Sequence, residues 1–301
     1  MTEVPGPFDD PLLAYVGLAA VALVALSVAA WLARLSAARV PIQTWLFLLP
    51  AIFIPLWLGA LAWAIFITIV AILGAKEFAK TTGLYAQRPF VLVVYAAIIA
   101  VNAAAYARTD GVFLTLPMWS FLALTLVPIL MNRTEQMVQW FALSVMAITF
   151  YGFFLGHLVW LYGAPQGLGY LLFVVTATQL NDVLAFLGGK RFGRHTWTAL
   201  SPNKTIEGSL FALGGTLVLA FAQWPIAFPH LPWYGVLVAG LIVGVGGQVG
   251  DLTMALIKRN AGVKDFGGML PGHGGITDRT NSLMVTAPTF THAIGFLFGP
   301  I

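Results

Sequence analysis

Charged side chains gather in one stretch of this chain, residues 246–283, although long hydrophobic segments precede and follow it. Three carboxylates alternate with four basic side chains there: Asp251, Asp265 and Asp278 with Lys258, Arg259, Lys264 and Arg279. Proteins hold Mg²⁺ through one or two carboxylates together with the phosphate oxygens of a substrate. The stretch therefore favours metal-assisted chemistry on a phosphate group. The alternative is a mixed-charge loop that only faces solvent between two membrane spans.

The centre of this stretch, Pro-Gly-His-Gly-Gly at residues 271–275, is incompatible with a helix. Its glycines permit positive φ angles and a close approach of the backbone, which suits a loop that offers N–H groups to a phosphate. Asp278 and Arg279 follow at the expected N-terminus of the last span, where an anion is favoured. Before the loop, Asp251 and Lys258 are two helical turns apart and so share one helix face. The pattern predicts a phosphate-binding loop between two helices.

A second polar stretch covers residues 181–210. Asp182 ends a segment, residues 136–181, that contains no Asp, Glu, Lys or Arg. We expect it in or near the membrane, where an ionisable group is costly and commonly functional. The alternative is a carboxylate at the end of a span that pairs with Lys190 or Arg191.

Further along, residues 201–208 read Ser-Pro-Asn-Lys-Thr-Ile-Glu-Gly. This order is typical of a helix start, with Ser201 as the N-cap and Pro202 as the first helical residue. Lys204 would then lie in the first turn, where a positive charge opposes the helix dipole. An anion bound beside Lys204 would offset this conflict, so the segment hints at a second phosphate contact.

The composition is that of an integral membrane protein. The chain has 301 residues, 59% of them hydrophobic and 9% charged, whereas soluble domains carry about 25% charged residues. It contains no cysteine, which excludes disulfides and thiolate metal sites. The few basic residues lie between apolar segments, so we expect no nucleic-acid binding. The predicted fold is all-α and polytopic.

About ten apolar segments are long enough to cross a bilayer. They are residues 11–33, 42–56, 57–75, 89–107, 112–131, 137–160, 167–188, 208–227, 232–250 and 283–299. Residues 40–75 are read as two spans in a tight hairpin, because every Lys and Arg except Arg108 then falls on one side, which the positive-inside rule makes cytoplasmic. We expect residues 1–165 to form an N-terminal membrane part, and residues 166–301 a catalytic part with two cytoplasmic polar loops.

The two polar stretches resemble the phosphatidate cytidylyltransferase (CDP-diacylglycerol synthase) family. The family's C-terminal motif contains Gly-Asp-Leu, Lys-Arg, Lys-Asp, Pro-Gly-His-Gly-Gly, Asp-Arg and Ser-Leu. The chain has these groups, with the family's spacing, at 250–252, 258–259, 264–265, 271–275, 278–279 and 282–283. The family's Asn-Asp site matches Asn181 and Asp182, and its Ser-Pro-Lys-Lys-Thr-x-Glu-Gly motif matches residues 201–208. The N-terminal half resembles the family only in being apolar.

The resemblance implies a reaction of phospholipid biosynthesis. Phosphatidate attacks the α-phosphate of CTP, pyrophosphate leaves, and CDP-diacylglycerol forms at the cytoplasmic face of the inner (plasma) membrane. Mg²⁺ is expected at Asp251 and Asp278, with Asn281 as a further oxygen ligand, and Lys258 and Arg279 are expected to act with them in catalysis. The expected substrate-binding residues are Asp182, Ser201, Lys204, Arg259, Lys264, Asp265, His273, Gly274 and Gly275.

The chain departs from the family pattern at four positions. Met254 and Ala255 replace the family's Glu-Ser pair, Asn281 replaces an Asp, and Asn203 replaces a Lys. Fewer acidic ligands should weaken Mg²⁺ binding. Three interpretations therefore stay open: an enzyme with a sparser metal site, an enzyme for another lipid phosphate or nucleotide, and a relative that binds without catalysing.

A transporter of anionic lipids is a further alternative, but the inverted repeats and mid-membrane polar sites of such proteins are not evident. The oligomeric state is open, and a homodimer is one assembly to expect because related membrane enzymes often pair. Lys76 and Glu77 read as an ordinary cytoplasmic helix end.

Overall fold

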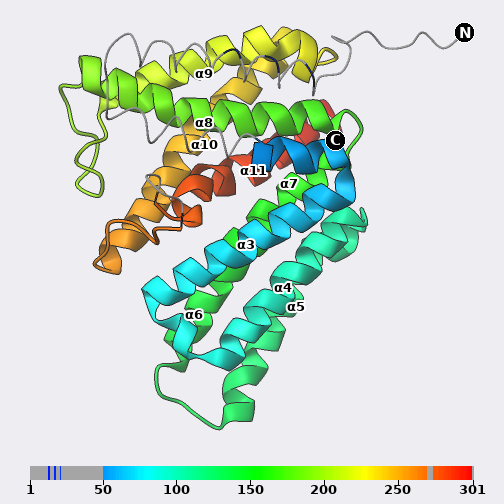
Figure 1. Ribbon diagram of the computed structural model, residues 1–301, viewed down its shortest axis with the longest axis vertical. Coiled ribbons are helices and arrows are strands. Elements are labelled where there is room, and N and C mark those ends of the chain that lie inside the picture. Colours follow the sequence, from blue (N-terminus) through cyan, green and yellow to red (C-terminus); the bar gives the residue numbers. More distant parts are fainter. Residues whose placement is uncertain (1–12, 14–16, 18–20, 22–49, 270–273, 300–301) are drawn as a thin grey trace, which may run out of the picture.

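The computed structural model describes residues 50–269 and 274–299, and single positions at 13, 17 and 21. The protein is all-α, as predicted (Figure 1). The described residues contain no β-strand, and an isolated bridge joins Thr196 to Thr205. The elements are α3 (Ala60–Thr82), η2 (Leu84–Ala86), α4 (Arg88–Tyr106), α5 (Asp110–Met131), α6 (Met137–Ala147), η3 (Ile148–Phe154), α7 (Leu155–Tyr162), α8 (Gly167–Phe192), α9 (Ile206–Ala227), α10 (Trp233–Asn260) and α11 (Ile276–Phe298).

Seven spans in the described part of the chain are long and apolar enough to cross a membrane. They are α3, α4, α5, the continuous α6–η3–α7 rod (Met137–Tyr162), α8, α9 and α10. The protein is therefore an integral membrane protein. The expected span 283–299 corresponds to α11 (Ile276–Phe298), which is not among these seven. Most of the expected spans 11–33 and 42–56 lies outside the described residues, so the total of about ten stays a prediction.

The apolar region 40–75 was expected to contain a break near residue 56. The structure has helical residues at 50–58, an interruption at Gly59 with φ of 106°, and then α3. Helix α3 continues beyond the expected end at residue 75 as far as Thr82, because Gly83 there takes a left-handed conformation and closes the helix. Lys76 and Glu77 are consequently inside a helix instead of at its end.

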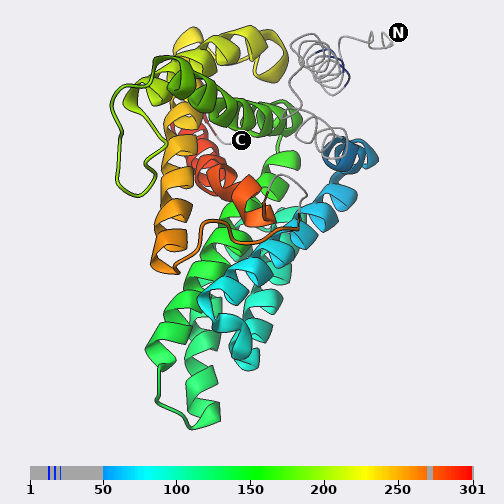
Figure 2. The ribbon, with the colours of Figure 1, turned by 60° about the vertical axis from the view of Figure 1, so that its left-hand side comes forward.

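The helices form two groups that share α11. Helices α8 and α9 lie side by side, and α3, α4 and α5 form a bundle with the α6–η3–α7 rod (Figures 1 and 2). Helix α11 lies between these groups and contacts α10, α8, α7 and α3. Residues from both groups therefore meet around α11, and α7 also contacts α8 directly.

Helix α11 is more polar than its neighbours because it is surrounded by protein. Its buried residues include seven with polar side chains: Thr277, Asp278, Thr280, Asn281, Ser282, Thr286 and Thr291. It begins at Ile276, which confirms that Asp278 and Arg279 lie at a helix N-terminus, and it starts before the apolar span expected from residue 283. In the same way α10 continues past the expected end at 250 to Asn260. Much of the polar motif is therefore helical, at the C-terminal end of α10 and the N-terminal end of α11.

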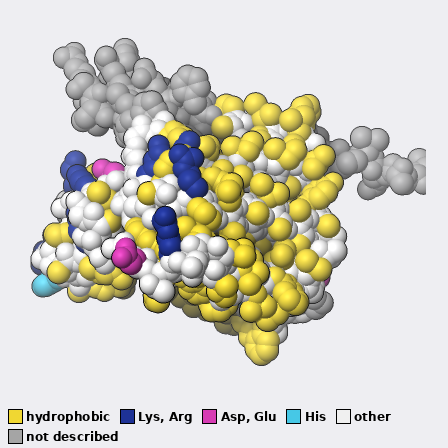
Figure 3. All heavy atoms as spheres, turned by 90° about the horizontal axis from the view of Figure 1, so that it is seen from below, with side chains coloured by type: hydrophobic (Ala, Val, Ile, Leu, Met, Phe, Trp, Pro, Cys, Tyr) yellow, Lys and Arg dark blue, Asp and Glu magenta, His cyan; other side chains and the backbone are white. Residues whose placement is uncertain are grey.

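Charge is concentrated on the surface of the molecule. In the view from below, Lys, Arg, Asp and Glu side chains gather on one part of the face, and hydrophobic side chains cover most of the rest (Figure 3). This distribution is typical of a protein whose apolar sides contact lipid and whose charged ends contact water.

Candidate active site

The first polar cluster is built around Asp251, which α10 presents to α11. Its Oδ2 pairs with Lys204 Nζ at 2.6 Å, and its Oδ1 accepts hydrogen bonds from Asn281 Nδ2 and from Ser282 Oγ, the latter at 3.3 Å. The helices approach this closely because Gly250 has no side chain: a Cβ there would lie 2.6 Å from the Asn281 carbonyl oxygen. The glycine of the Gly-Asp-Leu motif thus positions its aspartate against α11.

Asp182 joins the same cluster from α8. The Ser282 hydroxyl lies 3.1 Å from Asp182 Oδ2 and 3.3 Å from Oδ1, as well as 3.3 Å from Asp251. Ser282 therefore stands between two carboxylates that come from different helices. The alternative expected for Asp182, an ion pair with Lys190 or Arg191, is not among the ion pairs of the described residues.

A buried amide network supports this cluster. Gln248 Nε2 donates to Asn181 Oδ1 at 2.7 Å, and Gln248 Oε1 accepts from Lys204 Nζ at 3.2 Å and from Ser209 Oγ at 3.3 Å. Asn181 in turn donates to Thr216 Oγ1 at 2.9 Å. Sequence reasoning missed Gln248, although a polar residue one helical turn before Asp251 in an apolar, Gly-rich span was a usable signal.

Lys204 reaches the cluster from a turn and not from a helix. Its N–H donates to Ser201 O at 2.9 Å, which closes a turn across Pro202. The N-cap of α9 is Thr205, whose Oγ1 accepts from Gly208 N at 3.1 Å. The prediction of Ser201 as the N-cap was therefore wrong, because Thr205 is held extended by its bridge to Thr196 and the helix can begin only after it.

Glu207 fixes the loop that carries this turn. Its Oε2 accepts from the backbone N–H groups of Arg194 and His195 at 3.0 and 3.2 Å, and its Oε1 lies 2.6 Å from His195 Nδ1. The loop between α8 and α9 is thereby tied to the start of α9, and Lys204 is held close to Asp251.

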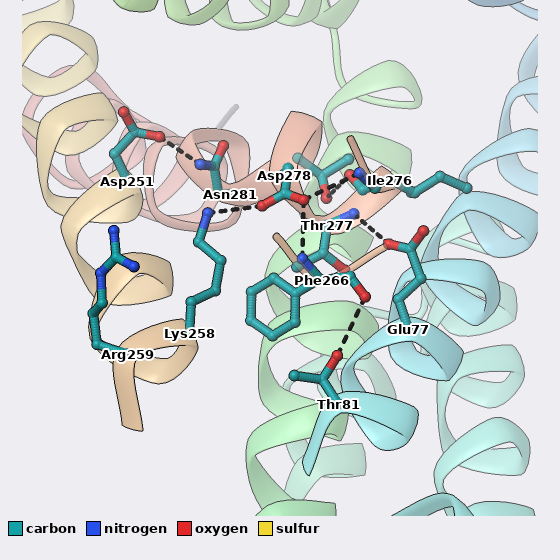
Figure 4. Close-up of polar contacts among 12 residues, drawn as sticks. Glu77, Thr81, Asp251, Lys258, Arg259, Phe266, Ile276, Thr277, Asp278 and Asn281 are labelled. Atoms are coloured by element: carbon teal, nitrogen blue, oxygen red, sulfur yellow. Dashed lines mark hydrogen bonds and ion pairs between the residues drawn. The ribbon is translucent and has the colours of Figure 1, made fainter. Parts of the chain in front are cut away.

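The second polar cluster is built around Asp278 at the start of α11 (Figure 4). Its Oδ1 pairs with Lys258 Nζ at 2.8 Å. Its Oδ2 accepts from the backbone N–H groups of Phe266 and Gly275, both at 3.1 Å. Only 5% of the Asp278 side chain is exposed, so all of its oxygens are engaged within the protein.

Glu77 of α3 completes the second cluster, which corrects the expectation of an ordinary helix end. It is 6% exposed, and its Oε2 accepts from Thr277 N at 3.0 Å. The N–H groups of Gly275 and Thr277 are thus occupied by carboxylates of the protein. These two donors are therefore not free for the phosphate contact expected at the N-terminus of α11.

The remaining predicted residues lie around these clusters. Arg259 donates from Nε to Leu200 O at 3.3 Å, which connects α10 to the turn at Ser201. Lys264, Asp265 and Arg279 are exposed, and Gly274 has the positive φ, 81°, that the loop was expected to need. His273 lies outside the described residues.

Two of the positions that depart from the family pattern have a clear structural setting. Asn281 donates its amide N–H to Asp251 and accepts from Ser282 N at 2.8 Å, where a carboxylate would repel Asp251. Met254 is 1% exposed and belongs to the hydrophobic core.

A divalent cation fits the first cluster better than the second. Asp182, Asp251 and Ser282 supply hard oxygen donors, and Lys204 is the one cation within ion-pair distance of either carboxylate in the described part of the chain. This matches the preference of Mg²⁺ for one or two carboxylates. Asp278, by contrast, is already neutralised by Lys258 and two N–H groups.

Comparisons with known proteins agree with the motifs. A phosphatidate cytidylyltransferase of Synechocystis is 42% identical over 125 residues, which are 41% of this chain and 42% of that protein. The uncharacterized protein YnbB of Escherichia coli is 40% identical over 153 residues, 48% of this chain and 50% of that protein. The chain thus spans half or less of these two relatives.

A longer match corrects the view that only the C-terminal motifs are shared. A phosphatidate cytidylyltransferase of Staphylococcus aureus is 32% identical over 247 residues, which cover 79% of this chain and 92% of that protein. The sequence profile of the cytidylyltransferase family matches residues 39–297, and so includes α3 with Glu77. Both matches extend over the apolar N-terminal half. This chain therefore belongs to the cytidylyltransferase family.

Proposed function

We propose that this protein transfers the cytidylyl group of CTP to phosphatidate, giving CDP-diacylglycerol and pyrophosphate. A phosphate oxygen of phosphatidate forms a bond to the α-phosphorus of CTP, and the bond to the oxygen that bridges to the β-phosphate breaks. The observation that carries the proposal is the first cluster, in which Asp182 and Asp251 converge on Ser282 beside Lys204, in a chain of this family.

Asp182, Asp251 and Ser282 would hold Mg²⁺. When bound, the ion would neutralise the charge of the phosphates and make the α-phosphorus a better electrophile. Asn281 keeps Asp251 oriented through its amide N–H. We assign Asp278 the role of holding Lys258 and the loop in place, instead of its expected role as a metal ligand.

The basic residues would hold the anionic substrates. Lys204 lies against Asp251, and Lys258 lies against Asp278, so each is fixed where a triphosphate can replace or share its carboxylate partner. Arg259 and Arg279 are exposed beside the two clusters and would bind the outer phosphates or the lipid phosphate. Catalysis by such a site consists of positioning and charge stabilisation.

No general base is required, because a phosphate monoester is mostly dianionic near pH 7, with a second pKa of about 6. Phosphatidate therefore supplies an ionised nucleophile. His273 keeps only its expected part in the shape of the loop.

A groove beside α11 supports a lipid as the acceptor. It has a volume of about 710 Å³ and is lined by Phe154, Val285, Pro288, Thr289, His292, Ala293 and Phe296. Val285, Thr289, His292 and Phe296 succeed one another on a single face of α11, which leads back to Ser282. The one basic side chain, His292, is hydrogen-bonded to buried His157 at 3.0 Å. An acyl chain of phosphatidate would lie in this groove with its phosphate at the first cluster.

The charged loops indicate on which side of the membrane the reaction takes place. If the candidate spans α8, α9 and α10 cross the membrane in turn, the loop before α9 and the segment before α11 lie on one side of it. We assign this side to the cytoplasm, since it holds nearly all basic residues and CTP is cytosolic. The membrane would be the inner (plasma) membrane.

A second candidate is binding of a lipid phosphate or nucleotide without turnover. It is favoured by one observation: Asn281 and Lys204 already occupy the oxygens of Asp251. Under this alternative the cation site would be too weak to fill.

The deciding experiment is an assay of the purified chain in nanodiscs with phosphatidate, labelled CTP and Mg²⁺, beside the Asn281→Asp variant. CDP-diacylglycerol from the unchanged chain is the expected result. Product from Asn281→Asp but none from the unchanged chain would establish the binding-only alternative. Absence of product from both, with CTP and phosphatidate still bound, would reject cytidylyl transfer.

A further inference from the structure

Glu77 is a buried carboxylate to which the proposed chemistry gives no task. It lies on the face of α3 that also carries Gly74 and Thr81 and that meets the start of α11. It takes part in no ion pair among the described residues. Burial of an unpaired carboxylate is costly. A group kept at this cost, with Oε1 left without a hydrogen-bond partner in the described part of the chain, calls for a specific reason.

The contacts of this face join α3 to both sides of the loop that precedes α11. On one side, Glu77 Oε2 accepts from Thr277 N at 3.0 Å, and Thr277 Oγ1 donates to Gly74 O at 3.2 Å. On the other side, Thr81 Oγ1 donates to Phe266 O at 3.2 Å (Figure 4). Residues about 200 positions apart in sequence thus fix the backbone before and after the loop.

The carboxylate also fills the space between two glycines. A Cβ on Gly267 would lie 2.7 Å from Glu77 Oε1, and a Cβ on Gly275 would lie 2.6 Å from Glu77 Oε2. By contrast, a Cβ on neighbouring Gly268 would meet no atom within 4 Å. Gly267 and Gly275 are therefore the positions at which the backbone closes on Glu77, and Gly268 is not.

We infer that Glu77 is a positioning residue, which clamps the backbone at Gly267 and at Gly275–Thr277 and thereby sets the place of Asp278 and Lys258. The charge of the carboxylate is stabilised by the N-terminal dipole of α11, because it bonds an N–H of the first turn. Asp278 bonds Phe266 N and Gly275 N from the other side, so the two carboxylates hold the same two backbone segments. Movement of Glu77 would be passed to Asp278, and from there to Lys258.

The structural part of the inference is tested by amide hydrogen exchange on the full chain in nanodiscs, without nucleotide. In Glu77→Ala, exchange should quicken about tenfold or more in peptides that contain Phe266 and Thr277, since a hydrogen bond and its support are lost. Lys80→Ala, on the exposed side of the same helix, is the matched control and should leave both peptides unchanged. Equal exchange in Glu77→Ala and the unchanged chain would overturn the inference.

A double-mutant cycle keeps the test decisive if Glu77→Ala folds poorly. Gly267→Ala should quicken exchange at Thr277, because the new methyl group pushes the carboxylate off its N–H, whereas Gly268→Ala should not. Glu77→Gln is the partner variant in the cycle. Displacement of a neutral amide from Thr277 N costs less than displacement of a carboxylate, so Gly267→Ala should then quicken exchange at Thr277 by a smaller factor. Equal effects of Gly267→Ala and Gly268→Ala would refute the clamp.

The functional part rests on the proposed function. In Glu77→Gln and Glu77→Ala, KM for CTP should rise about tenfold, with KM for phosphatidate unchanged. A loss of folded protein would lower kcat alone. A chain without cytidylyl transfer but with the expected exchange results would reject the proposed function and leave the clamp standing, so the two failures are distinguishable.

Discussion

The two polar clusters of this protein contain the same residue types and differ in how completely their charges are satisfied. In the first, Asp182 and Asp251 share one hydroxyl, that of Ser282, and Asp251 alone pairs with the ammonium group of Lys204 and accepts from the amide of Asn281. In the second, Asp278 has an ammonium group and two backbone N–H groups to itself, and Glu77 bonds a third N–H. Each cluster has two carboxylates and one ammonium group, but in the first Asp182 bonds only a hydroxyl among the described residues, so this cluster is suited to a cation. The second is closed and is suited to holding a loop.

This comparison predicts that substitutions in the first cluster act on chemistry and those in the second act on structure as well. Loss of a charge that binds a metal or phosphate should leave the fold intact. Loss of a buried hydrogen-bonded carboxylate should leave donors unsatisfied and lower stability.

The largest effect is expected for Asp251→Asn. It removes one of two carboxylates at the proposed cation site but keeps the size of the side chain, so cytidylyl transfer should fall by about 10² to 10³-fold. The unfolding temperature in nanodiscs should change little. A rate within about threefold of the unchanged chain would remove Asp251 from the cation site.

Asp278→Asn should combine a loss of activity with a loss of stability. The amide cannot neutralise Lys258 and can accept from Phe266 and Gly275 only weakly, so we expect a lower unfolding temperature and about a tenfold to hundredfold lower kcat/KM. Both quantities are measured on the same preparation. Lost turnover at an unchanged unfolding temperature would instead favour Asp278 as a metal ligand and would contradict the division between the clusters.

Asp182→Asn should change the metal requirement more than the maximal rate. With one carboxylate left, the Mg²⁺ concentration for half-maximal activity should rise about tenfold, and much of the rate should return at high Mg²⁺. Removal of Mg²⁺ by a chelator should abolish cytidylyl transfer by both the unchanged chain and Asp182→Asn. An unaltered Mg²⁺ titration would place the cation away from Asp182.

The smallest effect is expected outside both clusters, at the groove. Thr289→Trp should fill part of it and raise KM for long-chain phosphatidate about threefold to tenfold, while KM for CTP stays the same. A short-chain phosphatidate, which does not extend to Thr289, is the matched control. The same change with both lipids would place the acyl chain elsewhere.

The sequence by itself determined the class of protein, most span positions from α3 onward and the motifs that the family shares. Hydropathy is local, so the apolar stretches could be recognised without knowing what they contact. Motif spacing is also local: Asp251 and Lys258 were expected on one helix, and α10 confirms this. The limits of the apolar segments did not mark the helix ends, since α10 and α11 extend into the polar motif, where protein contacts replace lipid.

Only the tertiary structure decided which charges meet. Glu77 is flanked by Lys76 and followed by Lys80, so its sequence context is that of a helix end, and its burial depends on α11, which lies far along the chain. The N-cap of α9 was predicted at Ser201 but is Thr205, because a bridge with Thr196 holds Thr205 extended. The convergence of Asp182 and Asp251 on Ser282 required three helices to pack together. Such contacts are set by the packing of distant elements, which residue spacing within one segment does not encode.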